Sequence, residues 1–280
     1  MNIKTKINPN NLFTDPAPDI LVPPSNDTLI MESHGSRLFV RLHLPAFEDM
    51  DGKCPVVVML HGYPGNERNF DIAQSLRMAG AAVVHFSYRG VWGSHGEYCF
   101  SHIIEDAIEV ASQIRARAEE FRIDPQRLYL FGHSMGGFAA LNAMAQGLEV
   151  AGAILMAPCN MSHKYLYDKP SFQALMDSQK NGYFNTPSGT YIEEDVSRNA
   201  EKWLFANAAD HLNLQIPYAF IGGSLDQLTP PEVHILPLME LLREKGASVQ
   251  YRQLRDGHDF PASRVELTRQ IVQWLAEMDQ

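Results

Sequence analysis

The chain has 280 residues, of which 45% are hydrophobic and 20% are charged, and its formal net charge is −10. This length suits one large domain with a single core, or a domain that carries an insertion. No run of Lys and Arg forms the basic patch that nucleic-acid-binding proteins carry, so we expect no nucleic-acid partner.

The cysteine and histidine patterns argue against structural disulfides and metal sites. Cys54, Cys99 and Cys159 are odd in number and scattered, and no two histidines have the spacing of a metal-binding pair. We therefore expect no metal and no cofactor. The first 20 residues lack the apolar core of a signal peptide, and no apolar stretch is long enough for a membrane span. These features favour a cytoplasmic protein.

The N-terminal part predicts an arm followed by a hairpin. Residues 1–26 are rich in Pro and Asn, which indicates an extended arm that wraps the domain or is partly disordered. Residues 28–35 and 36–46 are typical of two strands joined at Gly35, because apolar and polar residues alternate along the second.

From residue 55 onward, short apolar runs alternate with helical patterns. The expected strands lie at residues 56–60, 81–88, 127–132, 150–158, 217–224 and 248–254, and the expected helices at 66–80, 102–118, 135–147 and 231–246. Asn66 is a candidate cap for the first helix, and a last helix opens with a capping box from Ser263 to Glu266. This alternation predicts an α/β fold with a doubly wound, mostly parallel sheet.

The alternation stops at Cys159. Residues 160–213 contain no run typical of a buried strand but hold many aromatic residues, so we expect a helical insertion that lies over the sheet as a cap. The predicted α/β core then comprises residues 27–159 and 214–280.

The stretch LYLFGHSMGG, residues 128–137, places a serine between glycines where a strand turns directly into a helix. A residue at such a turn adopts a strained conformation, and side chains two positions to either side would collide, which explains Gly132 and Gly136. The turn lifts the Ser134 hydroxyl above the sheet at a helix N-terminus, where partial positive charge favours an oxyanion. This G-x-S-x-G pattern predicts a nucleophile elbow.

The turn HGYPG, residues 61–65, follows the strand at 56–60. Backbone N–H groups that face a carbonyl oxygen stabilise it as it becomes an oxyanion. We expect the N–H of Tyr63, after Gly62, and the N–H of Met135 to form such an oxyanion hole. A plain turn between a strand and a helix is the alternative.

Two later strand ends carry ionisable residues. Ligands of open α/β sheets bind at the carboxyl ends of the strands, and Asp226 and His258 each follow an expected strand. We expect His258 to accept the Ser134 proton and Asp226 to hold the imidazole in the required tautomer. Asp256 and Asp259 are competing acids, but they lie too close to His258 in sequence to support it from behind.

The order Ser134, Asp226, His258, together with the H-G turn and the serine elbow, resembles the α/β-hydrolase superfamily. The resemblance covers residues 28–278, including an insertion before the acid-bearing strand, where these enzymes carry a cap. The segments SHGSRLFVRLHLPA, HGYPG, YRGVWGSHGEY, RIDPQRLYLFGHSMGG and GSLDQLTPPE are similar to the branch of small acyl esterases and dienelactone-hydrolase-like or peptidase-like enzymes.

The resemblance implies a catalytic triad of Ser134, Asp226 and His258. In such enzymes the loop similar to residues 88–98 lies near the mouth of the active site. The resemblance therefore implies that Arg89 and Trp92 line the pocket, with core packing and a buried ion pair as the alternative for these two residues.

These features predict a serine hydrolase that cleaves a carboxylic ester of a small-molecule acyl substrate through an acyl-enzyme on Ser134. A peptidase, a thioesterase or a carbon–carbon hydrolase on the same triad is an alternative, and a non-catalytic ligand-binding protein of the same fold is another. The aromatic residues of 160–213 suggest an apolar or aromatic acyl group, or simply pack the cap onto the core. The sequence leaves the oligomeric state open.

Overall fold

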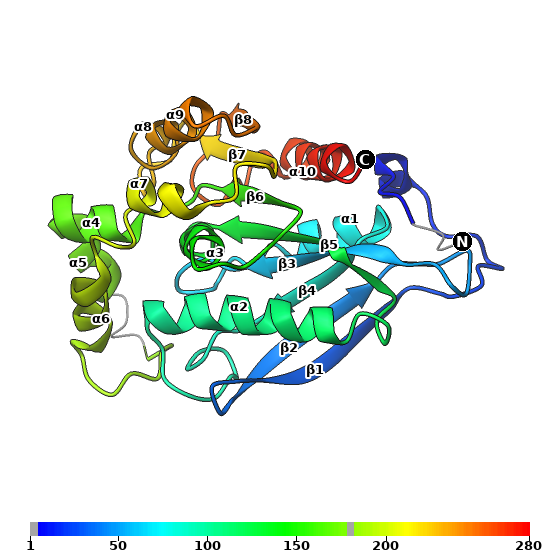
Figure 1. Ribbon diagram of the computed structural model, residues 1–280, viewed down its shortest axis with the longest axis horizontal. Coiled ribbons are helices and arrows are strands. Elements are labelled where there is room, and N and C mark those ends of the chain that lie inside the picture. The colour runs from blue at the N-terminus through cyan, green and yellow to red at the C-terminus, as the bar shows by residue number, and fades with distance from the viewer. Residues whose placement is uncertain (1–4, 178–181) are drawn as a thin grey trace.

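The computed structural model describes residues 5–177 and 182–280 (Figure 1). Its strands form one eight-stranded sheet in the order β1-β2-β4-β3-β5-β6-β7-β8. The strands are β1 (Ser25–Ser33), β2 (Ser36–Leu44), β3 (Cys54–Leu60), β4 (Ala82–Phe86), β5 (Ile123–His133), β6 (Gly152–Met156), β7 (Tyr218–Gly223) and β8 (Val249–Leu254).

The strand directions confirm the predicted fold class. β3 to β8 are parallel to their neighbours, whereas β1 and β2 form an antiparallel hairpin and β2 is antiparallel to β4. Every residue of β3 is buried, as the unbroken apolar run at this position predicts for a central parallel strand. The carboxyl ends of the parallel strands therefore meet at one edge of the sheet.

Helices cover both faces of the sheet. They are α1 (Phe70–Met78), α2 (Phe100–Ala116), α3 (Met135–Ala145), α4 (Met161–Tyr167), α5 (Lys169–Asp177), α6 (Tyr191–Asn199), α7 (Phe205–Ala208), α8 (Pro231–His234), α9 (Leu236–Glu244) and α10 (Arg264–Met278). Val57 and Met59 of β3 belong to one core cluster with α1 and α10, and the alternate residues Val56 and Val58 belong to another with α2, α3 and α9. This is the doubly wound arrangement.

One predicted helix start is wrong, and one predicted capping box does not form. α1 begins at Phe70, with Asn69 rather than Asn66 at its N-cap, because residues 66–69 continue the turn that follows β3. α10 follows Ser263, but the Ser263 side chain makes no capping hydrogen bond with any described residue. The Glu266 carboxylate accepts a hydrogen bond from Arg252 of β8 instead, at 2.5 Å.

The segment from 160 to 213, called here the insertion, contains α4 to α7 and the short 3₁₀ helix Ala209–His211. Residues 178–181 of this expected cap and residues 1–4 of the expected arm lie outside the described residues. In Figure 1 helices α4, α5 and α6 stack together on the side of the molecule away from the two chain ends. No helix within the described ranges is long and apolar enough to cross a membrane.

The arm follows the edge of the core. The N–H of Thr5 donates to the carbonyl of Lys53 at 2.9 Å, and the N–H of Asn8 donates to that of Ala79 at 2.8 Å. A short 3₁₀ helix at Pro9–Phe13 interrupts the otherwise extended path. These backbone contacts hold the arm against the amino-terminal half of the core.

Candidate active site

Ser134 occupies a sharp turn between β5 and α3. Its backbone angles are φ 56° and ψ −119°, and it is the N-cap residue of α3. A non-glycine residue in such a conformation stores about 1–3 kcal/mol of strain. Backbone hydrogen bonds hold the turn: the Ser134 N–H donates to Met156 of β6, and the Ser134 carbonyl accepts from Gly137 and Cys159, each at 2.9 Å.

The glycines of the elbow are required by close backbone contacts. A Cβ atom on Gly132 would lie 2.6 Å from the carbonyl oxygen of Gly136, across the turn as expected. A Cβ atom on Gly136 would lie 1.9 Å from the carbonyl oxygen of Leu60, so this glycine makes room for β3 rather than for Gly132. A Cβ atom on Gly62 would lie 3.1 Å from the Ser134 Cβ, which shows how closely the HGYPG turn approaches the serine.

Ser134, His258 and Asp226 form one hydrogen-bonded chain. The His258 Nε2 lies 2.8 Å from the Ser134 Oγ, and the His258 Nδ1 lies 2.8 Å from an oxygen of the Asp226 carboxylate. With a proton on Nδ1 that donates to Asp226, Nε2 is free to accept the serine proton. The side chains of the chain are largely sheltered, since Ser134 and Asp226 are each 5% exposed.

The Asp226 carboxylate is ionised and fully partnered. Backbone N–H groups of Leu228 and Thr229 donate to one of its oxygens at 2.8 and 2.9 Å, and His258 donates to the other. Burial alone would raise the pKa of Asp226, but the hydrogen bonds from His258 and Thr229 outweigh burial and lower the pKa to about 2. The acid therefore remains a fixed negative charge behind the imidazole.

Thr229 is a site residue that the sequence reasoning missed. Its fully buried hydroxyl lies 2.7 Å from the Asp226 carboxylate and 3.1 Å from the His258 Nδ1. It can donate to Asp226 while accepting from His258, which fixes both side chains. The signal in the sequence was its position three residues after the acid, the distance at which Thr side chains often bond within a turn.

The two competing acids, Asp256 and Asp259, have partners other than the Nδ1 of His258. The Asp256 carboxylate accepts from the N–H groups of Gly257 and Ala262, at 2.8 and 2.9 Å. Asp259 is exposed, and its carboxylate lies 3.7 Å from the ring of His133. The structure therefore brings Asp226, and neither Asp256 nor Asp259, to the Nδ1 side of His258.

The expected oxyanion donors are the N–H groups of Tyr63 and Met135. Each follows a residue of the close approach described above, because Gly62 precedes Tyr63 and Ser134 precedes Met135. The Met135 N–H starts α3 and has no backbone acceptor among the described residues. The Tyr63 hydroxyl donates to the carbonyl of Leu175 in α5 at 3.1 Å, and its ring stacks on Phe184 with centroids 4.8 Å apart. The role of the two N–H groups stays a prediction.

The structure separates the two expected pocket residues. Arg89 is buried in an ion pair with Asp106 of α2, with Nε and an acid oxygen 2.6 Å apart, which is the alternative considered for it. Trp92 is 38% exposed and lies on the HGYPG turn, where its Nε1 donates to the carbonyl of Pro64 at 2.7 Å. The Trp92 ring stacks on Tyr183 of the insertion, with centroids 5.4 Å apart.

One group of side chains has the spacing of metal ligands among residues 5–177 and 182–280: His133, His258 and Asp259. Both ring nitrogens of His258 already contact Ser134 and Asp226. The His133 Nε2 lies 3.2 Å from the His258 carbonyl oxygen. Burial, and next repulsion from a protonated His258, lower the pKa of His133 to about 3. We therefore read His133 as a neutral support for the His258 loop.

Three buried histidines around the site make the fold sensitive to acid. Burial first of all lowers the pKa of His61, His133 and His234 to about 3 each, from 6.5. Between pH 6.5 and pH 3 the unfolded state binds more protons than the folded state. The contribution of these histidines to the free energy of unfolding is therefore fully present above pH 6.5 and is lost as the pH falls towards 3. We expect the free energy of unfolding to fall by about 2 kcal/mol per buried histidine between pH 7 and pH 5.

Urea unfolding at pH 7, 6 and 5 measures this dependence. His133→Gln keeps a hydrogen-bonding side chain without the titration, so its free energy of unfolding should fall by about 2 kcal/mol less than that of the wild type between pH 7 and pH 5. An equal free energy of unfolding at pH 7 and pH 5 would contradict the prediction.

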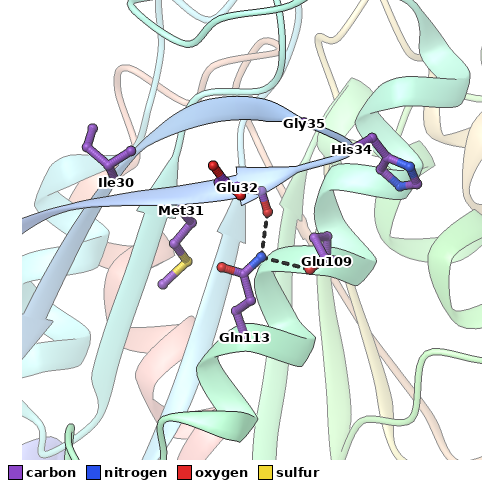
Figure 2. A pocket seen from close by; sticks show the side chains of 7 residues that line it. All are labelled: Ile30, Met31, Glu32, His34, Gly35, Glu109 and Gln113. Carbon is purple, nitrogen blue, oxygen red and sulfur yellow. Dashed lines mark hydrogen bonds between the residues drawn. The ribbon is translucent and has the colours of Figure 1, made fainter.

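A separate hollow of about 480 Å³ lies between the β1–β2 hairpin and α2. Figure 2 shows that Gln113 of α2 reaches both Glu109 and the backbone of Glu32, so its amide is already partnered. None of the expected site residues lines this hollow. We place the chemistry at Ser134 instead.

The fold and the strand-end serine define an α/β hydrolase. Residues 52–212 match the model of the family described as serine aminopeptidase, S33. The chain belongs to this family of the α/β-hydrolase superfamily, which confirms the resemblance inferred from the sequence.

Individual relatives agree at the level of the fold. An uncharacterized 31.7 kDa protein of Escherichia coli, encoded in the traX-finO intergenic region, is 24% identical over 216 residues, which are 64% of this chain and 75% of the relative. A brefeldin A esterase superposes with a TM-score of 0.70 at 18% identity, over 95% of this chain and 80% of the esterase. A puromycin hydrolase superposes with a TM-score of 0.69 at 20% identity, over 95% of this chain and 40% of the hydrolase.

Proposed function

We propose that the protein is a serine hydrolase that cleaves a carboxylic ester through an acyl-enzyme on Ser134. The observation that carries the proposal is the chain of two 2.8 Å contacts from the Ser134 hydroxyl through His258 to Asp226. A serine hydroxyl is a weak nucleophile unless an adjacent base removes its proton as it attacks, and this chain supplies that base.

The reaction proceeds in two steps. The Ser134 Oγ attacks the carbonyl carbon while its proton passes to the His258 Nε2, and the Asp226 charge stabilises the imidazolium that forms. The N–H groups of Tyr63 and Met135 stabilise the oxyanion. The tetrahedral intermediate then expels the alcohol, which takes the proton from His258. Water repeats the sequence on the acyl-enzyme and releases the acid.

An ester is preferred to an amide as the substrate because an alkoxide leaves more readily than an amide anion from the same intermediate. The similarity to a brefeldin A esterase supports this choice. The description of the matching family as a serine aminopeptidase supports an aminoacyl amide as the second candidate. The fold and the proposed triad suit either reaction, so the substrate must be identified by experiment.

A fluorophosphonate probe tests the proposed nucleophile. We expect one covalent label per chain, on Ser134, and none on Ser134→Ala or on heat-denatured protein. Ser188→Ala, which changes an exposed serine of the insertion, serves as the matched control and should label like the wild type. A folded wild-type protein that takes no label, or a label on another residue, would overturn the proposal.

A panel of 4-nitrophenyl esters, aminoacyl 4-nitroanilides and acyl-CoA thioesters then separates the substrate classes. Esters should give the highest kcat/KM. Faster cleavage of the anilides would favour the peptidase, and labelling without turnover of any substrate would favour a ligand-binding protein of the same fold.

A further inference from the structure

Lys164 is a buried cation without a partner. It lies in α4 of the insertion and is 3% exposed, and its ammonium makes no hydrogen bond, ion pair or cation–π contact with any residue in 5–177 or 182–280. Burying a charge is costly unless it is paired, so buried Lys side chains nearly always have an acidic or carbonyl partner. An unpaired ammonium in this position indicates a partner that the folded chain does not itself supply.

The backbone places the start of α4, the helix that carries this lysine, beside the nucleophile. The N–H of Cys159 donates to the Ser134 carbonyl at 2.9 Å, and the next residue, Asn160, is the N-cap of α4. The N–H of Lys164 donates to the Asn160 carbonyl at 3.2 Å, so the lysine lies one helical turn from Asn160. One turn of an α-helix is about 5.4 Å long. Lys164 therefore starts from the strand end next to the elbow.

His234 contributes a second polar group to the same region. Its Nδ1 accepts the N–H of Asn160 at 3.0 Å, so in the neutral ring the proton is on Nε2, and this N–H has no partner among the described residues. Burial, and next the positive charge of Lys164, lower the pKa of His234 to about 3. Asp226 and His258 also act electrostatically on this imidazole, so His234 lies near both the proposed triad and Lys164.

A third unpartnered group lies beside these two. The His163 Nδ1 is buried and has no hydrogen bond within the described part of the chain, and its ring centroid lies 5.8 Å from that of His234. More than nine in ten buried polar groups in proteins are satisfied. The His163 Nδ1 is fully buried, whereas the Lys164 Nζ and the His234 Nε2 retain accessible surface, as groups that line a site for a polar ligand would.

The nearby acids do not neutralise the lysine. Asp168 lies one turn further along the chain and interacts electrostatically with Lys164, but its carboxylate accepts from the Ser171 N–H at 3.4 Å and forms no ion pair with the lysine. Asp226 is held by His258 and Thr229. Within the described residues, no carboxylate therefore pairs directly with the Lys164 ammonium.

We propose that this region binds an anionic group of the substrate, so that the ester cleaved at Ser134 carries a carboxylate that pairs with the Lys164 ammonium and accepts the His234 Nε2–H. This inference rests on the proposed function and narrows its substrate class. It also disfavours an aminopeptidase, because the α-ammonium of an aminoacyl substrate would be repelled by Lys164.

Matched substrates test the inference on both sides of the ester bond. On the acyl side, the 4-nitrophenyl half-ester of adipic acid is compared with its primary amide. On the alcohol side, the acetate of 3-hydroxybenzoic acid is compared with that of 3-hydroxybenzamide. Each pair differs only in a carboxylate that is ionised at pH 7.5. We expect kcat/KM to favour the carboxylate about 10- to 100-fold in one of the two pairs.

Variants of Lys164 test whether this lysine causes the preference for the carboxylate substrate. Lys164→Met should abolish the preference, and Lys164→Arg should retain part of it. Lys169→Met removes an exposed lysine of the same insertion and should leave the ratio unchanged. Thermal unfolding checks each variant, and we expect Lys164→Met to be no less stable than the wild type because it removes an unpaired buried charge.

The outcomes separate this inference from the proposed function. Hydrolysis of all four esters with ratios near one would overturn the anionic site while the esterase stands. Binding to Ser134→Ala, measured by isothermal titration calorimetry with the same four compounds, does not depend on turnover. Equal affinities within both pairs would overturn the anionic site even if the wild type hydrolysed none of them.

Discussion

Replacement of Ser134 or of His258 by alanine should each lower kcat by about 10⁵- to 10⁶-fold on the best ester of the panel, and the double variant should be no slower than either single one. The reason is that the serine attacks only as the imidazole removes its proton, so loss of either partner disables both. The 2.8 Å separation of Ser134 Oγ and His258 Nε2 makes this coupling possible.

Single-turnover and steady-state rates measure the effect. Asp226→Asn should lower kcat by about 10⁴-fold, because the imidazole then loses its required tautomer. Asp19→Asn is the control, since this exposed acid of the N-terminal arm contacts none of Ser134, His258 and Asp226, and it should change kcat by less than about twofold. A Ser134→Ala variant that retains a tenth of the wild-type kcat would exclude the acyl-enzyme mechanism.

Much of the sheet could be predicted because its signals are local. A strand buried on both faces must be apolar at every position, and the runs at β3, β6 and β7 show this directly. The elbow was equally readable, since a strand that turns directly into a helix leaves no room for side chains at Gly132 and Gly136. The atom that excludes a Cβ at Gly136 could not be read, because it belongs to Leu60 of a distant strand.

The features that sequence reasoning misjudged or left open depend on distant partners. Glu266 reads as part of a capping box, but it lies opposite Arg252 of β8, and this pairing exists only once the sheet has formed. Arg89 lies in a loop that the family resemblance places at the site mouth, yet Asp106 of α2 draws it into the core. In both cases a charged side chain pairs with an oppositely charged residue that is distant in the sequence, Glu266 with Arg252 and Arg89 with Asp106.

Lys164 gave no signal at all in the sequence. A lysine in a short, polar helix is ordinarily exposed, and its composition alone predicts a solvated side chain. Its burial follows from the way α4 leaves the end of β6 beside Ser134 and packs against the α8 residue His234. Sites of this kind are visible only when the hydrogen bonds of each buried group are followed through the structure.

Gly136→Ala should be the most destabilising single substitution in the elbow, lowering the free energy of unfolding by about 3 kcal/mol or more. Alanine in place of glycine ordinarily stabilises a helix interior by about 1 kcal/mol. At Gly136, however, the added Cβ would lie 1.9 Å from the Leu60 carbonyl oxygen, and neither backbone can move without disturbing β3 or α3. The clash must therefore outweigh the gain in helix propensity.

Urea unfolding and the rate of fluorophosphonate labelling measure the two consequences of this clash together. Gly132→Ala, with its closest contact at 2.6 Å, should be less harmful, and Gly189→Ala, whose Cβ would meet no atom within 4 Å, should be near neutral. The expected order of loss, Gly136 over Gly132 over Gly189, follows from geometry alone. Since α3 can separate from β3 only by shifting Ser134, labelling should slow in the same order, and a stable Gly136→Ala variant that labels at the wild-type rate would show that the elbow does not depend on this contact.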